Sequence, residues 1–161
     1  MNGFTKLSVV AVCALAGAST TVLAQDAAPP TPEKLAQQAT ELRQGLLKLV
    51  SWSFGPVGDM LKNKTPFDAA VVQKSAGRIH ELATMLPDAF QTDTRKFQVK
   101  TRAKENIWTN LADFSSKADD LQKAAAALGD AAKGGDKAAT MLAARSVGKA
   151  CSGCHDNYRE N

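Results

Sequence analysis

The chain has 161 residues, about the length of one domain, and 44% of them are apolar. Its formal net charge is +4, from 20 lysines and arginines against 16 acidic residues. This excess is small and spread over the whole chain, so the composition argues against a nucleic-acid-binding protein.

The first 24 residues have the pattern of a secretory signal peptide. Lys6 provides a positive start, residues 7–18 form a short apolar run, and Val22-Leu23-Ala24 offers the small residues that a signal peptidase recognises. We therefore predict cleavage after Ala24, which leaves residues 25–161 as one exported domain. The apolar run is too short to favour a membrane span, so no membrane attachment is expected after cleavage. A retained N-terminal anchor is the alternative.

Two helices are predicted in the first half of the domain. Thr31-Pro32-Glu33 combines an N-cap, a proline suited to the first helical position and an acid in the first turn. Thr65-Pro66-Phe67-Asp68 repeats this start signal after a turn, and Pro87 predicts the end of the second helix. The first helix is expected to end near Lys62. Its predicted apolar stripe comprises Leu35, Ala39, Leu42, Leu46, Leu49, Ser53, Val57 and Met60.

Two more helices are predicted in the second half. Residues 88–100 show no apolar stripe and are expected to form a long crossover. An apolar repeat from Ala103 to Leu128 predicts the third helix, which Gly134-Gly135 ends. Asp136 then caps a last helix that runs to about Tyr158. Four amphipathic helices without any β-type alternation predict an all-α fold, an antiparallel four-helix bundle.

The last predicted helix carries the most informative motif, Cys151-Ser152-Gly153-Cys154-His155. C-x-x-C-H is the attachment signature of c-type haem. Two thiols three residues apart share a helix face and reach the two vinyl groups of one porphyrin, and the histidine supplies an axial iron ligand. Cys13 is lost with the signal peptide, so no cysteine remains for a structural disulfide. We predict one covalently bound haem c near the C-terminal helix.

Other kinds of site also use a cysteine pair. A dithiol redox centre usually opens a helix after a strand, and no strand pattern precedes Cys151. A zinc site needs further ligands, and His80 is the only other histidine. A disulfide between cysteines three apart on a helix has poor geometry. Covalent haem is therefore the favoured interpretation.

Further segments carry a resemblance to a known family. They are Arg43-Gln44 with the run through Leu47 to Phe54-Gly55, Thr65-Pro66-Phe67-Asp68-Ala69-Ala70, Leu86-Pro87 with Ala89-Phe90, Ile107-Trp108, Gly135-Asp136, and the C-terminal motif continued by Asp156-x-Tyr158-Arg159. In these segments the predicted mature chain resembles the bacterial cytochromes c′. The resemblance implies a periplasmic four-helix bundle, commonly a homodimer through its first two helices, whose haem iron is ligated by a single histidine.

The resemblance also implies roles for the residues that match the family's haem-binding motif. His155 would be the axial iron ligand, and Cys151 and Cys154 would be the thioether anchors. Leu47 would block the opposite side of the haem. Without the resemblance, a leucine on a helix is most often an ordinary core residue.

Polar residues that match the family would border the haem. Arg43 and Gln44 match a pair that approaches the propionates, and a buried propionate needs a cation or donor nearby. Thr101 and Arg102 match a segment at the haem edge, where family members often carry an acid in place of Arg102. Arg159 matches a basic residue beside the proximal face, although it also complements the negative end of the last helix.

A low-spin electron carrier needs a second strong ligand, which in Met-ligated relatives comes from the early part of the first helix. Residues 31–59 contain no methionine or histidine, and Met60 lies about 20 Å beyond Leu47 along the helix. Lys48 points about 100° away from Leu47 on the helix. His80 has polar neighbours and is expected at the surface. The iron is therefore predicted to be five-coordinate and high-spin.

An apolar distal side offers no donor to stabilise bound dioxygen, whereas nitric oxide and carbon monoxide depend less on such donors. The sequence therefore predicts a periplasmic protein that binds nitric oxide and carbon monoxide, or exchanges single electrons with an unidentified redox partner protein. A low-spin, six-coordinate electron carrier of the same fold is the alternative. An enzyme is not expected, because no general acid or base is predicted beside Leu47.

Overall fold

The computed structural model describes residues 29–161, and the predicted signal peptide at residues 1–24 lies outside this range. The described helices are α1 (Pro32–Leu61), α2 (Ala69–Thr84), α3 (Leu86–Ala89), the 3-10 turn η1 (Glu105–Ile107), α4 (Leu111–Lys133) and α5 (Lys137–Tyr158). The only β-type pairing in this part of the chain is a single bridge between Ala103 and Arg159. The predicted all-α class is confirmed.

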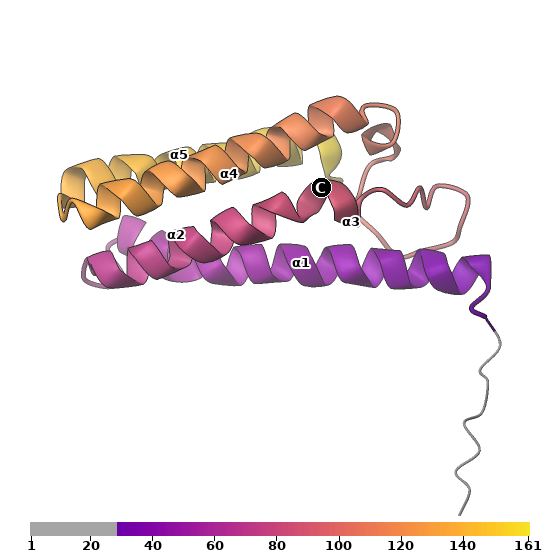
Figure 1. The fold of residues 1–161 in the computed structure, drawn as a ribbon, viewed down its shortest axis with the longest axis horizontal. Helices are drawn as coiled ribbons and strands as arrows, with labels where there is room; N and C mark the ends of the chain where they lie inside the picture. Colours follow the sequence, from indigo (N-terminus) through magenta and orange to yellow (C-terminus); the bar gives the residue numbers. More distant parts are fainter. Residues whose placement is uncertain (1–28) are drawn as a thin grey trace, which may run out of the picture.

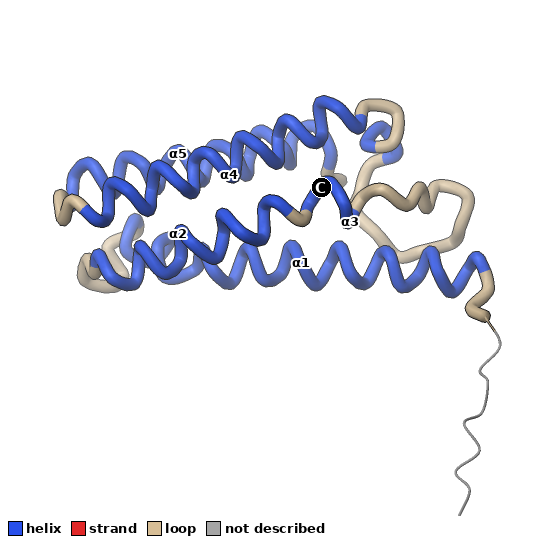
Figure 2. Tube along the Cα trace, in the orientation of Figure 1, coloured by secondary structure: helices blue, strands red, loops and turns tan. Residues whose placement is uncertain are grey.

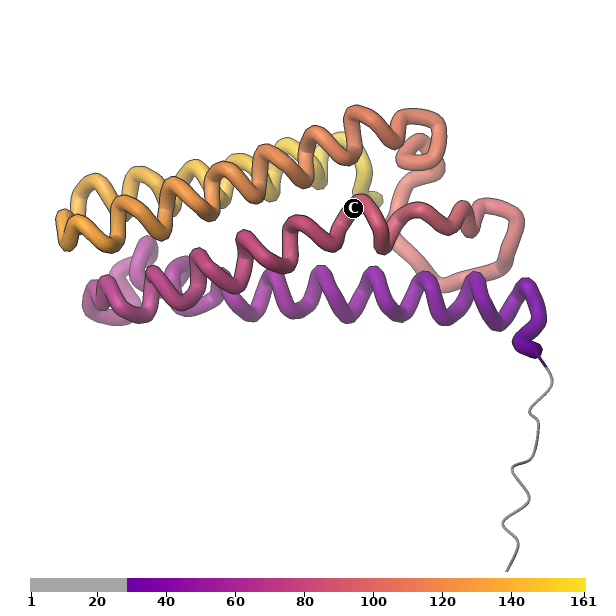
Figure 3. The backbone as a smooth tube through the Cα atoms, viewed as in Figure 1, coloured from indigo at the N-terminus to yellow at the C-terminus, as the bar shows by residue number. Residues whose placement is uncertain are grey.

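The four long helices form two layers that extend along a common direction (Figure 1). α4 and α5 lie side by side in one layer, and α1 and α2 make the other. The colours of Figure 3 show that the chain reverses direction between α1 and α2 and again between α4 and α5. The connection from α3 to α4 loops out at the end of the bundle where α5 finishes (Figure 2). This is the predicted four-helix bundle.

Capping side chains fix the predicted starts of α1 and α5. The Thr31 hydroxyl accepts a main-chain N–H bond of 3.3 Å at the start of α1. The Asp136 carboxylate accepts the main-chain N–H groups of Ala138 and Ala139, at 2.7 and 3.3 Å, at the start of α5. Between α4 and α5, Gly135 adopts a φ of +73°, a conformation that favours glycine. These boundaries were predicted correctly.

The predicted ends of α2 need correction. α2 begins after Asp68 rather than Thr65, because the Asp68 carboxylate accepts two main-chain N–H bonds at 2.9 and 3.1 Å and acts as the N-cap. Pro87 does not end this helix, which stops at Thr84. Pro87 instead lies in the first turn of the short helix α3, where a proline displaces no hydrogen bond.

The predicted start of the third long helix is also wrong. α4 begins at Leu111 and not near Ala103. The main chain of Ala103 pairs with Arg159, and the main-chain N–H of Lys104 donates to the Tyr158 carbonyl at 3.0 Å. These long-range bonds keep the segment before η1 out of the helix, although its apolar spacing resembles that of the helix.

The stripe predicted for α1 mixes two faces of that helix. Leu35, Leu42 and Leu49 are exposed at 48%, 63% and 51% of their surface. The buried face of α1 consists of Ala36, Thr40, Arg43, Leu46, Val50, Ser53, Val57 and Met60. Apolar spacing alone did not distinguish the core face from a second apolar face. None of the helices in residues 29–161 is both long and apolar enough to cross a membrane.

Candidate haem site

The predicted attachment motif lies in the last two turns of α5. Cys151, Cys154 and His155 are half-buried, and both thiols are free. The main-chain N–H of Arg159 donates to the His155 carbonyl at 3.0 Å and closes the final turn. The helix therefore holds both thiols and the imidazole in fixed relative positions near its end.

Two adjoining cavities, of ≈ 270 Å³ and ≈ 550 Å³, open beside this motif. The residues that line both of them are Leu47, Leu86, Phe114, Cys154, His155 and Arg159. They are therefore two parts of one site between α1, α4 and α5. Leu47 and Arg159 are exposed as well as lining the cavities, so the site reaches the molecular surface.

Every residue that the sequence analysis assigned to the site lines one of these cavities. Leu86, Phe90, Ile107, Phe114 and Tyr158 also line the site and were not assigned to it. Of the assigned residues, the first cavity is lined by Arg43, Gln44, Leu47, Thr101, Arg102, Cys154, His155 and Arg159, and the second by Leu47, Cys151, Cys154, His155 and Arg159. The fold thus brings together residues from α1, from the crossover and from α5. Their individual contacts to a haem stay predictions.

The chemistry of the donor set fits haem. Burial raises the pKa of Cys154 to about 11 and also raises the pKa of Cys151, so both are neutral thiols at neutral pH. A dithiol redox centre needs a cysteine whose pKa is lowered, so these thiols do not suit one. Burial, helped by the Arg159 guanidinium, lowers the pKa of His155, which keeps the imidazole neutral and available as a ligand. Residues 29–161 contain no group of three His, Cys, Asp or Glu side chains arranged around a metal ion.

Arg43 is buried, with 3% of its surface exposed, and it holds the crossover. Its Nε donates to the Ala89 carbonyl at 2.8 Å, its Nη1 donates to Thr94 Oγ1 at 3.0 Å, and its Nη2 donates to the Thr92 carbonyl. Burial lowers the pKa of Arg43, although a guanidinium stays charged at any ordinary pH. The guanidinium therefore lines the cavity and also anchors the segment after α3. The sequence analysis had assigned only the first of these two roles.

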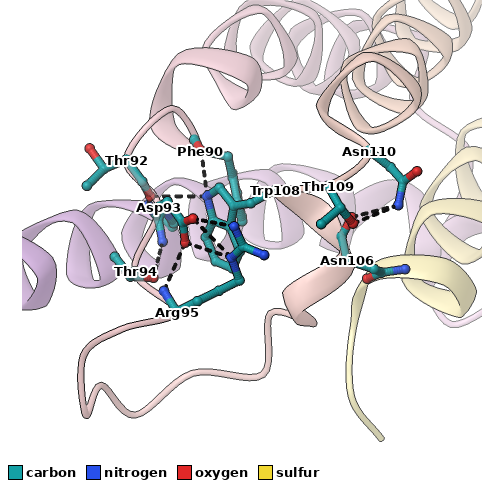
Figure 4. Close-up of polar contacts among 10 residues, drawn as sticks. Phe90, Thr92, Asp93, Thr94, Arg95, Asn106, Trp108, Thr109 and Asn110 are labelled. Carbon is teal, nitrogen blue, oxygen red and sulfur yellow. Dashed lines mark hydrogen bonds and ion pairs between the residues drawn. The ribbon is translucent and has the colours of Figure 1, made fainter.

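Two aromatic rings also contact the Arg43 guanidinium. The Arg43 guanidinium carbon lies 5.0 Å from the centre of the Phe90 ring and 5.2 Å from that of Trp108, within the range of cation–π contacts. The Trp108 indole N–H donates to the carbonyls of Phe90 and Thr92 at 3.0 and 3.1 Å, and Figure 4 shows Trp108 beside both residues. Gln44 Nε2 donates to the Lys100 carbonyl at 2.8 Å, further along the crossover.

The C-terminal end of α5 is bonded to the last part of the crossover, just before η1. The main-chain N–H of Glu160 donates to the Arg102 carbonyl at 2.8 Å, and Arg102 Nε and Nη2 both donate to the Glu160 carbonyl, at 3.0 and 2.9 Å. Together with the Ala103–Arg159 bridge, these bonds fasten the crossover to the chain just after His155. Thr101 and Arg102 are therefore held at the mouth of the cavity.

The side chains considered above as a sixth iron ligand lie outside the candidate haem site. Met60 lines a separate cavity beside the turn between α4 and α5. His80, expected at the surface, is half-buried on α2, with Nδ1 at 3.3 Å from the Gln122 carbonyl of α4. Among the described residues that line the site, His155 is the only histidine, and no methionine is present. Lys117 lines the second cavity, and the sequence analysis did not single it out.

A C-x-x-C-H motif that opens into a largely apolar cavity of a four-helix bundle defines a c-type haem protein of the bundle class. The family model for cytochrome c′ matches residues 38–159. Cytochrome c′ from Rubrivivax gelatinosus is 36% identical over 122 residues, which cover 76% of this chain and 94% of the relative. The chain belongs to the cytochrome c′ family.

Solved structures agree with this assignment. Cytochrome c prime from Shewanella frigidimarina is similar with a TM-score of 0.72 at 38% sequence identity, covering 78% of this chain and 97% of that one. A nitric oxide complex of a variant of cytochrome c prime from Alcaligenes xylosoxidans is similar with a TM-score of 0.69 at 28% identity, covering 78% and 97%.

Proposed function

We propose that residues 25–161 form a periplasmic protein that carries one haem c, after removal of the signal peptide at residues 1–24. Cys151 and Cys154 would each attach to a vinyl group of the porphyrin, and His155 would be the axial iron ligand. In each attachment the thiol S–H adds across the vinyl double bond: a C–S bond forms, the hydrogen goes to the neighbouring carbon, and no oxidant is required. The bound group supplies an iron that binds a diatomic gas or exchanges one electron.

The iron is proposed to be five-coordinate and high-spin. The observation that carries this proposal is the pairing of Leu47 on α1 with His155 on α5 as lining residues of the same two cavities. A leucine side chain has no lone pair to donate to iron. Arg43 and Gln44 lie one turn before Leu47, and each already donates to a main-chain carbonyl of the α3–α4 connection.

Nitric oxide and carbon monoxide are the proposed ligands. Leu47 provides no hydrogen-bond donor for dioxygen, and it must move to admit any ligand on its side. The nitric oxide complex of the Alcaligenes xylosoxidans relative supports gas binding in a protein of this fold. Single-electron transfer with a redox partner protein uses the same site. Enzymatic turnover is not proposed, because no carboxylate lines either cavity among the described residues.

We further propose a homodimer formed through α1 and α2. Leu35, Leu42 and Leu49 recur every seven residues on α1, which places them on one face of the helix, and all three are exposed. Trp52 lies next to this face with 62% of its surface exposed. The Arg78 guanidinium of α2 lies 4.7 Å from the centre of the Trp52 ring. An exposed apolar stripe of this length on a folded domain is typical of an interface.

Optical and electron paramagnetic resonance spectra of the purified full-length protein test the coordination. The ferric form is expected to show the broad optical bands and the resonances of a high-spin haem, and the ferrous form the broad optical bands of a high-spin, five-coordinate haem. Nitric oxide and carbon monoxide should each change the ferrous spectrum with a saturable dependence on concentration. Sharp low-spin bands in the ferrous protein before any gas is added would contradict the proposal and favour the six-coordinate electron carrier.

A further inference from the structure

The charged side chains that line the candidate haem site are all cationic. Arg43, Arg102 and Arg159 line the first cavity, and Lys117 lines the second. No aspartate or glutamate of residues 29–161 lines either cavity. The electrostatic potential at the mouth of the site is therefore set by positive groups.

The crossover beside this mouth adds further cations. Residues 95–104 include five basic residues and no acidic one: Arg95, Lys96, Lys100, Arg102 and Lys104. Arg95 is paired with Asp93 at 2.6 Å, whereas the other four form no ion pair with any residue of the range 29–161. We call Lys96, Lys100, Arg102, Lys104 and Arg159 the basic rim. These five residues carry five positive charges, more than the net charge of +4 of the whole chain.

Hydrogen bonds hold two members of the basic rim in place without neutralising them. Arg102 donates to the Glu160 carbonyl, and Lys104 Nζ donates to the Asp156 carbonyl at 3.1 Å. Both acceptors are uncharged main-chain groups. The carboxylates of Glu160 and Asp156 are exposed at the end of the chain, and Asp113 already accepts the Tyr158 hydroxyl. The cations of the rim thus keep their charge available to a partner.

We propose that the basic rim is the docking surface for an acidic electron-transfer protein, which exchanges one electron with the haem at the adjoining cavity. This proposal rests on the haem site proposed above. Complementary charge around a redox site raises the association rate by about 10- to 1000-fold at low ionic strength. The basic rim, in which every cation except the half-buried Lys104 is exposed, favours a carboxylate-covered protein surface over a membrane. The apolar residues between its lysines, Phe97 and Val99, are half-buried and not free to insert.

A matched pair of triple variants tests the surface in the haem-loaded, full-length protein. The rim variant is Lys96→Gln, Lys100→Gln and Lys104→Gln, none of which lines either cavity. The control variant is Lys62→Gln, Lys137→Gln and Arg145→Gln; these exposed cations lie near the opposite end of the bundle and carry the same total charge. The probe is a reduced plant-type [2Fe–2S] ferredoxin, an acidic donor that passes one electron to the ferric haem without proton transfer. Stopped-flow mixing measures the rate constant at several ionic strengths.

At low ionic strength the rim variant should react about tenfold more slowly than the native protein, and the control variant should change less than about twofold. The difference should vanish at high salt. Reduction by hexaammineruthenium(II), a cationic donor, should become faster in the rim variant. Equal slowing of both variants, or no slowing of the rim variant, would overturn the proposal. Rim-dependent binding to phosphatidylglycerol vesicles without an effect on ferredoxin would overturn it in favour of a membrane surface. An unchanged optical spectrum and nitric oxide titration in the rim variant separate either failure from a failure of the haem site.

Discussion

The Tyr158 hydroxyl donates a hydrogen bond of 2.5 Å to Asp113 Oδ2, and this bond joins the last turn of α5 to the first turn of α4. The Tyr158 ring also meets the Phe114 ring edge-on, with 5.4 Å between ring centres. Tyr158 lies one helical turn beyond His155. The position of His155, the proposed axial ligand, therefore depends on how firmly α4 holds the end of α5.

Tyr158→Phe should lower the free energy of unfolding by about 1–2 kcal/mol at neutral pH, because a hydrogen bond to a charged acceptor is lost. Burial and the Asp113 carboxylate raise the pKa of Tyr158 from 10.0 to about 12. The folded protein therefore holds the phenol proton more tightly than the unfolded chain does. This contribution to stability is complete below pH 10.0 and is lost as the pH rises to about 12. Urea unfolding of both proteins across this range should show their difference shrinking; a difference that stays constant would contradict the linkage.

Arg43→Lys should destabilise the fold by about 3 kcal/mol, because the shorter side chain leaves buried acceptors on the crossover unpaired. Lys48→Ala is the control: it changes an exposed residue of the same helix and should shift the free energy of unfolding by less than about 0.5 kcal/mol. Urea unfolding gives the energies, and hydrogen exchange locates the change. Amide protection should fall first around Thr94 and Lys100. Equal effects of the two variants would show that Arg43 does not anchor this segment.

The outcome for Arg43 illustrates how far the sequence predicts this structure. Caps such as Asp136 and turns such as Gly135 act within a few residues, so the start of α5 follows from local chemistry. The partners of Arg43 lie about fifty residues away in sequence and become apparent only when the chain has folded. The extended conformation at Ala103 escaped prediction for the same reason, since its pairing partner, Arg159, is also distant in sequence. The motif and the family resemblance identified nine of the residues that line the two cavities, but not the bonds that position them.

Leu47→Ala should raise the affinity of the ferrous protein for carbon monoxide by about tenfold, because no leucine side chain must then move aside to admit the gas. Leu49→Ala is the matched control: the same change one half-turn away on α1, at a residue that does not line the haem site. Optical titration with carbon monoxide measures both affinities. An unchanged affinity in Leu47→Ala would mean that Leu47 does not restrict the ligand's side of the iron. The haem could still be five-coordinate in that case, which the spectra test separately.

The exposed stripe of α1 predicts the state of assembly. Leu42 and Trp52 expose 63% and 62% of their surfaces on the face proposed for dimerisation, so a charge at each position would be buried unpaired in a dimer. The full-length native protein is expected to sediment as a dimer at micromolar concentration, and Leu42→Glu with Trp52→Glu is expected to sediment as a monomer. Leu142→Glu is the control, because Leu142 is equally exposed, at 69%, but lies on α5. Sedimentation velocity distinguishes the species. A monomeric native protein would contradict an interface through α1 and α2. A monomeric Leu142→Glu variant beside a dimeric Leu42→Glu, Trp52→Glu variant would contradict it as well.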